Sequence, residues 1–278
     1  MPGGWHGWVV VCDAQGERFS KSDWLTLLAE PQSLLDGAQH TIKSDGCNAV
    51  VVKKLTTADK QVKAVIKQHR RAGGVREFFR SFGWPRAMQN FNSAVKTTRL
   101  GLPVAAPLAA VYRRTLLFCG RSIYISEYVD GVNLYEFLKN LPRDSKERLR
   151  VTGRLSDRLA EIFASLRRNG LWHRDAKATN FIVSGNGPDN YSVVLTDMDG
   201  IKPGFFARRT KQMRTLWQLA ASVMNLSTVS RTDYLRMFVA YCEKAGLPEA
   251  QRANTFRRLA QRAGAKHRRN CLRRSTQV

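Results

Sequence analysis

The chain has 278 residues, 43% of them apolar, and carries a formal net charge of +24 at pH 7. It is long enough for one large domain or two lobes, but its apolar runs are far shorter than the ~20 residues that cross a bilayer, and no secretory signal pattern opens it. Five scattered cysteines without Cys-x-x-Cys spacing argue against a disulfide framework or a zinc site and favour a reducing cytosol.

The first half of the chain is predicted to be rich in β-structure. A lead over residues 1–36 precedes a β-rich N-terminal lobe over residues 37–128, in which apolar alternation and turn residues mark the strands. Gly101 and Pro103 end the one long helix of this lobe, as Gly and Pro do just beyond a helix. The expected elements are strands over residues 5–12, 41–44, 49–55, 62–68, 109–112 and 123–128, and a helical stretch over 75–100 with a break at Gly83-Trp84-Pro85.

The second half is predicted to be mostly helical. Apolar residues at helical spacing indicate helices over 134–138, 148–169, 213–224 and 234–242, a hairpin spans 181–196, and Pro248 opens a last helix. We therefore expect an α+β protein with a helical C-terminal lobe over 129–250 and a basic C-terminal helix or tail over 251–278.

The segment at 251–278 holds nine lysines and arginines and no acidic residue. Such a charge attracts polyanions, among them nucleic acid, anionic lipid headgroups and phosphorylated glycans. Phe256 is its one aromatic residue, so the stacking platforms of single-strand binders are missing and nucleic acid is disfavoured. Two interpretations remain, a solvated tail that aids solubility and a surface that attracts an anionic membrane-held substrate.

Residues 171–182 are the most informative segment. They contain His173-Arg174-Asp175, then Lys177, then Asn180, and a later apolar run ends in Thr196-Asp197-Met198-Asp199. Phosphoryl transfer to a hydroxyl uses these groups in this order. A His-Arg-Asp triplet alone arises readily by chance. The full His-Arg-Asp-x-Lys-x-x-Asn string, placed between a predicted helix and a predicted hairpin, rarely arises by chance.

The residue types predict a role for each group. Asp175 is the candidate catalytic base for the acceptor hydroxyl. Asn180 and Asp197 are candidate ligands of Mg²⁺ (or Mn²⁺) on ATP, because this ion prefers hard oxygen ligands. Lys177 is expected near the transferring phosphoryl group. Asp199 is either a second metal ligand or a structural partner.

The N-terminal lobe should supply contacts to ATP. Among Lys53, Lys54 and Lys67, the last is favoured because it lies in the third strand, where kinases carry the lysine that contacts the α- and β-phosphates. Glu127 ends a strand at the expected hinge, where backbone groups would bind adenine. Gly46 is the remaining glycine of a reduced phosphate-binding loop.

Several segments together resemble the bacterial lipopolysaccharide kinases, the Kdo/heptose kinase (WaaP-like) family of the protein kinase-like superfamily. The resemblance covers about residues 37–241 and depends on Ile66-Lys67-Gln68-His69-Arg70-Arg71-Ala72-Gly73-Gly74, on Gly101-Leu102-Pro103 and on the acidic pair after Thr196. It implies a two-lobed protein kinase-like fold and Mg²⁺-ATP-dependent transfer to a Kdo or heptose hydroxyl of a lipid A-anchored acceptor. It also implies work at the cytoplasmic face of the inner membrane, with peripheral contact to anionic lipid.

Two departures keep other interpretations open. One glycine stands where a glycine-rich loop is expected, and Asn90 occupies the position of the helix glutamate that would pair with Lys67. A catalytically weak ATP-binding scaffold is therefore an alternative, and a protein serine/threonine kinase is another. The short segment between Asp199 and Met213, with no Ala-Pro-Glu, argues against a peptide acceptor.

Overall fold

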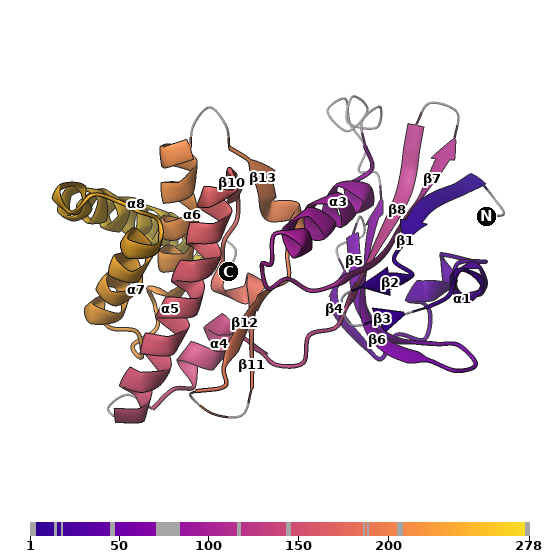
Figure 1. The fold of residues 1–278 in the computed structure, drawn as a ribbon, viewed down its shortest axis with the longest axis horizontal. Coiled ribbons are helices and arrows are strands. Elements are labelled where there is room, and N and C mark those ends of the chain that lie inside the picture. Colours follow the sequence, from indigo (N-terminus) through magenta and orange to yellow (C-terminus); the bar gives the residue numbers. More distant parts are fainter. Residues whose placement is uncertain are drawn as a thin grey trace. The chain divides into compact units, whose positions relative to one another are not determined.

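The computed structural model describes the chain except residues 1–3, 14–15, 18, 45–47, 71–83, 116–117, 143–145, 186, 188, 205–207 and 276–278. The chain divides into two compact units, one of residues 1–99 with 105–128 and one of residues 100–104 with 129–278. The first is built on a β-sheet and the second is mostly helical (Figure 1). This is the α+β arrangement that the sequence predicts.

A six-stranded antiparallel sheet forms the N-terminal unit, with strand order β1-β7-β8-β6-β5-β4. The lead contributes β1, which pairs with β7, so it belongs to the same sheet. The strands are β1 (Trp5–Val9), β4 (His40–Ser44), β5 (Asn48–Thr56), β6 (Gln61–Arg70), β7 (Pro107–Thr115) and β8 (Phe118–Glu127). A separate small hairpin pairs β2 (Cys12–Asp13) with β3 (Gly16–Glu17).

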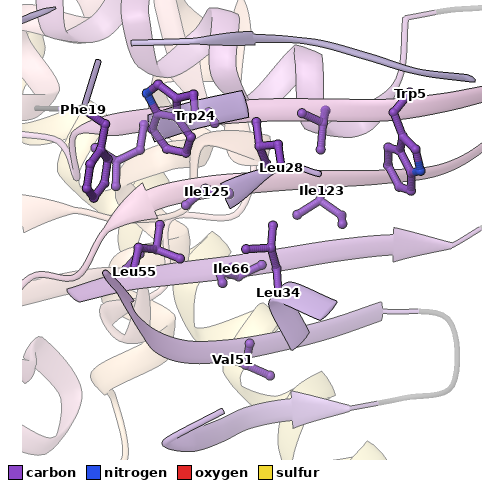
Figure 2. Close-up of a cluster of buried hydrophobic side chains, with 14 residues drawn as sticks. Trp5, Phe19, Trp24, Leu28, Leu34, Val51, Leu55, Ile66, Ile123 and Ile125 are labelled. Carbon is purple, nitrogen blue, oxygen red and sulfur yellow. The ribbon is translucent and has the colours of Figure 1, made fainter. Parts of the chain in front are cut away.

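In the middle of β6, side chains are buried at every second residue, and the apolar ones among them belong to the core of this unit. In β6, Ala64, Ile66 and Gln68 are buried, whereas the residues between them are half-buried. Aliphatic side chains from the strands pack with aromatic side chains of the lead, including Trp5 and Trp24 (Figure 2). The lead elements α1 (Lys21–Leu27) and η2 (Ser33–Leu35) thus cover one face of the sheet.

The helix α3 (Arg86–Arg99) also contacts the sheet, at β7, β8 and β6. The sequence predicts a helix from residue 75, but residues 71–83 lie outside the described part of the chain. Asn90 of α3 is 1% exposed, and its Oδ1 has no hydrogen-bond partner among the described residues.

The C-terminal unit packs long helices around two small sheets, ordered β12-β11-β9 and β10-β13. In it α5 contacts α7, and α6 contacts α8. Its helices are α4 (Leu134–Lys139), α5 (Lys146–Arg168), α6 (Arg208–Val223), α7 (Arg231–Lys244) and α8 (Glu249–Ser275), with short turns η3 (Ala178–Asn180) and η4 (Met198–Gly200). Its strands are β9 (Val132–Asn133), β10 (Leu171–His173), β11 (Phe181–Ser184), β12 (Ser192–Leu195) and β13 (Ile201–Pro203).

A buried ion pair joins α5 to the start of α7. Arg148, 7% exposed, donates to the Thr228 carbonyl from Nε (3.0 Å) and Nη2 (2.8 Å) and also to the Asp233 carboxylate. Asp233 in turn forms a capping box with Ser230. Burial raises the pKa of Asp233, but hydrogen bonds from Ser230 and the charge of Arg148 outweigh it, so this pKa lies below its usual value.

The basic C-terminal segment forms a packed helix. Thr255, Leu259 and Ala263, spaced four residues apart in α8, are buried, and Phe256 packs on Phe238 of α7 with ring centroids 5.2 Å apart. The solvated-tail interpretation therefore does not apply to residues 251–263, whereas residues 264–273 of the helix are half-buried or exposed. None of the helices described is both long and apolar enough to span a membrane.

Candidate active site

His173 is the centre of the candidate site. It ends β10, is fully buried and is held by Thr215 of α6, whose Oγ1 accepts from its backbone N–H (3.2 Å) and donates to its carbonyl (3.1 Å). The ring Nδ1 accepts from the Asp175 N–H (3.2 Å), and Nε2 lies 3.0 Å from the Asp197 carbonyl. A carbonyl can only accept, so the ring is neutral with its proton on Nε2.

The environment of His173 keeps it in this form. Burial lowers the pKa of His173, and the nearby Asp197 charge opposes this shift without reversing it. One neutral ring therefore ties the loop that carries Asp175 to the strand end that carries Asp197.

The candidate catalytic loop, residues 173–180, is closed by hydrogen bonds to one of its own carbonyl groups. The Lys177 N–H donates to the Asp175 carbonyl (2.9 Å), which also accepts from Asn180 Nδ2 (2.8 Å). Because Nδ2 points to this carbonyl, Oδ1 is the atom of Asn180 that can bind a cation. The side chains of Lys177 and Asp175 also form an ion pair, in which Nζ lies 2.8 Å from Oδ2 and both side chains are about half exposed. The loop thus presents a carboxylate already paired with a lysine.

The two acidic residues after β12 have different surroundings. The Asn180 carbonyl accepts from Thr196 N–H (3.0 Å), which places Asp197 directly beside the catalytic loop. Asp199 lies in η4, where its carboxylate is 3.0 Å from Arg174 Nη2 and 4.0 Å from Lys202 Nζ. Asp199 therefore already has basic partners, which favours the structural alternative that the sequence left open for it.

Asn180 and Asp197 suit a magnesium ion that also binds phosphate. Both are half-buried and supply hard oxygen atoms, the ligands that Mg²⁺ prefers when phosphates and water complete its shell. Within the described ranges, no three or more His, Cys, Asp or Glu side chains cluster as a metal site made by protein alone. The donor set fits a metal shared with ATP.

The nucleotide-binding candidates belong to the N-terminal unit. Lys67 lies in β6, with Val50 of β5 opposite it on one side and Tyr124 of β8 on the other. Glu127 ends β8, and its N–H donates to the Ala106 carbonyl (2.9 Å). Gly46 lies outside the described residues.

Sequence reasoning missed the residues that pack around the histidine ring. Gly200 is one of them, since a Cβ at this position would overlap the imidazole of His173. The Gly200 carbonyl also accepts from the Arg174 N–H at 2.7 Å. A glycine directly after Asp-Met-Asp was visible in the sequence, but only the folded chain reveals the ring against it.

Comparison with solved structures identifies the fold to which this chain belongs. Among solved structures, the chain resembles one described as "Crystal structure of BubR1 kinase domain", with TM-score 0.50, 17% identity, and 81% of this chain and 80% of that chain covered. It also resembles one described as "WaaP in complex with acyl carrier protein", with TM-score 0.65, 15% identity, and 93% of this chain and 98% of that chain covered. At these identities the likenesses establish the protein kinase-like fold that the sequence predicts.

The family follows from the sequence itself. Residues 52–241 match the model of the "Lipopolysaccharide kinase (Kdo/WaaP) family", and the chain belongs to that family. Membership makes it an ATP-dependent phosphotransferase that acts on a hydroxyl group, with the lipopolysaccharide core as its class of acceptor. No curated protein sequence matches the chain significantly.

Proposed function

We propose that this kinase transfers the γ-phosphoryl group of Mg²⁺-ATP to a hydroxyl of an inner-core sugar, Kdo or heptose, on a lipid A-anchored acceptor. The observation that carries the proposal is the link through His173, which joins the loop of Asp175 to the end of β12 at Asp197. That link holds the candidate base and a candidate metal ligand in fixed register, as phosphoryl transfer requires.

In this scheme Asp175 orients the acceptor hydroxyl and takes its proton as the oxygen attacks the γ-phosphorus. The bond from the γ-phosphorus to the β,γ-bridging oxygen breaks, and ADP leaves. Lys177, now paired with Asp175, would contact the transferring group when ATP is bound. Asn180 and Asp197 would hold Mg²⁺, which neutralises the charge that develops on the phosphates.

The N-terminal unit would bind the nucleotide. Lys67 is proposed to contact the α- and β-phosphates, and Glu127 to mark the hinge strand whose backbone binds adenine. Asn90, buried in α3 with no partner for its Oδ1 in the described part of the chain, stands where related kinases carry a glutamate. Its amide oxygen is proposed to do the work of that carboxylate toward Lys67.

The setting of the reaction follows from the acceptor. A lipid-anchored sugar requires the kinase to work at the cytoplasmic face of the inner membrane, and the charge of +24 favours peripheral contact with anionic lipid there.

The test is phosphate transfer from γ-labelled Mg²⁺-ATP to dephosphorylated lipopolysaccharide core, with a basic protein and a serine-rich peptide as parallel acceptors. Label in the glycolipid alone supports the proposal, and partial hydrolysis then identifies the labelled sugar. Label in the peptide and none in the glycolipid would indicate a protein kinase.

A further inference from the structure

A basic pocket lies in the C-terminal unit, between α6 and α8. Its volume is about 790 Å³, within the range of roughly 300–1,000 Å³ that is usual for ligand sites. Its walls include Trp172 of β10 and Trp217 of α6. Five cationic side chains complete them, and these are Lys211, Arg214, Arg258, Arg262 and Arg269.

Among the residues that the structure describes, no carboxylate balances the charge in this pocket. No acidic residue is among the described residues that line it, and no ion pair to a carboxylate joins these five cations within the described ranges. Like charges gathered in one concavity repel one another, and a bound anion relieves that repulsion. Arginine also matches phosphate and carboxylate groups with paired donors.

Trp172 gives the pocket a fixed aromatic wall. Trp172 is 7% exposed, and its Nε1 donates to the Pro203 carbonyl at 3.1 Å. Lys211 Nζ and Arg214 Cζ each lie 5.7 Å from the centre of its ring. An aromatic wall beside cations suits a ligand with both an apolar face and anionic groups, as a charged sugar has.

The chain segments that line the pocket lead toward the loop of Asp175. Trp172 directly precedes His173, and Arg269 and Lys266 of α8 follow Arg262 at helical spacing. Burial and then the charge of Lys177 lower the pKa of Lys266, and the Asp175 charge opposes them. The basic face of α8 therefore extends from the pocket to the neighbourhood of Asp175 and Lys177.

We propose that this pocket binds the anionic groups, phosphate or carboxylate, of sugars that adjoin the acceptor sugar, and so holds the glycan while one hydroxyl reaches Asp175. The proposal rests on the proposed function for the identity of the glycan. A nucleic acid fits less well, since Phe256 of α8 is packed on Phe238 and no further aromatic continues a stacking platform along the described part of α8.

The test measures binding without nucleotide, by calorimetry with deacylated lipopolysaccharide core oligosaccharide that keeps its phosphates. The pocket variant is Arg258→Gln/Arg262→Gln. The matched control is Arg257→Gln/Arg268→Gln, which removes the same charge from α8 at positions that do not line the pocket. Glutamine keeps helix propensity in both, and circular dichroism verifies that both are folded.

We expect the pocket variant to bind the oligosaccharide at least about tenfold more weakly, because two charge-assisted contacts are lost. The control should stay within about twofold of the wild type. Equal weakening in both variants would overturn the proposal, since a diffuse charge effect would then suffice. Wild-type affinity in the pocket variant would overturn it as well, and so would tighter pocket-dependent binding of a single-stranded oligonucleotide.

Steady-state transfer separates this proposal from the proposed function. A rise in the acceptor KM of the pocket variant, with the KM for ATP unchanged, supports the pocket. Transfer with an unchanged acceptor KM overturns the pocket and leaves the function standing. Pocket-dependent binding without any transfer to glycolipid in the wild type overturns the function and leaves anion binding by the pocket standing.

Discussion

Replacing His173 by leucine tests how the site is held together. Leucine has a similar size but no ring nitrogen, so the Asp175 N–H and the Asp197 carbonyl each lose a buried partner. An orphaned buried polar group costs about 1–3 kcal/mol. Asp175 and Asp197 are half-buried, so water can replace part of each lost hydrogen bond, and the two losses should together lower the free energy of unfolding by about 1–3 kcal/mol. With an m-value of about 2 kcal/mol/M in urea, the midpoint should fall by about 0.5–1.5 M.

The substitution should also lower kcat at least about tenfold, because Asp175 and Asp197 lose their fixed register. Urea unfolding and transfer kinetics are measured on the same preparations. The control is Leu155→Ala, a cavity variant at a buried position of α5, outside residues 173–180, that is expected to cost about 2–5 kcal/mol. Equal losses of kcat in the two variants would refute a positioning role for His173, and an unchanged urea midpoint would refute the hydrogen-bond account.

Three further outcomes are expected. Asp197→Ala should weaken Mg²⁺-ATP binding in calorimetry at least about tenfold and Asp199→Asn should not; unchanged affinity in the first would move the metal role to Asp199. The pKa of Asp233 lies below its usual value, so its stabilising contribution is fully present above about pH 4 and is lost as pH falls through the folded-state pKa. The free energy of unfolding of Asp233→Asn should therefore depend less on pH in that acid range than that of the wild type. Equal pH dependence of the two proteins would contradict the lowered pKa of Asp233. Gly200→Ala should cost about 1–3 kcal/mol in urea unfolding because its Cβ overlaps the ring of His173, and a neutral result would mean that the ring can shift.

Much of the fold could be predicted from the sequence where the pattern is local. The third strand was expected over 62–68, and β6 spans Gln61–Arg70 with Lys67 between two partner strands. The long helices α5 and α7 were visible as apolar stripes at helical spacing. The helix expected over 75–100 is described from Arg86, as α3.

Other elements of the fold depend on contacts between distant chain segments, and they could not be predicted from the sequence. The three-residue strands β10 and β13 are too short to show periodicity, and they pair across a separation of about 30 residues. In α8 the many arginines obscured the buried residues Thr255, Leu259 and Ala263, which pack the helix onto the unit. Those contacts also mean that charge substitutions, rather than deletion of residues 251–278, are the suitable test of its surface.

In the candidate site, too, local motifs could be predicted from the sequence and contacts between distant segments could not. Asp175, Lys177, Asn180 and Asp197 could be named because each of the two motif segments is contiguous in sequence. The hairpin between the segments brings them together through Phe181 opposite Leu195. The buried contacts of the His173 ring depend on chain segments that meet only after folding. Whether these residues perform the reaction remains a prediction of the scheme.

The most direct measurement compares wild type with Asp175→Ala in transfer from γ-labelled Mg²⁺-ATP to dephosphorylated lipopolysaccharide core, with ATP affinity measured alongside. The account predicts label in the wild-type glycolipid, none above background with the variant, and nearly equal ATP affinity for both. Wild-type rates of transfer by Asp175→Ala would contradict the assignment of the base. A folded, ATP-binding wild type that transfers nothing to the core would contradict the proposed acceptor.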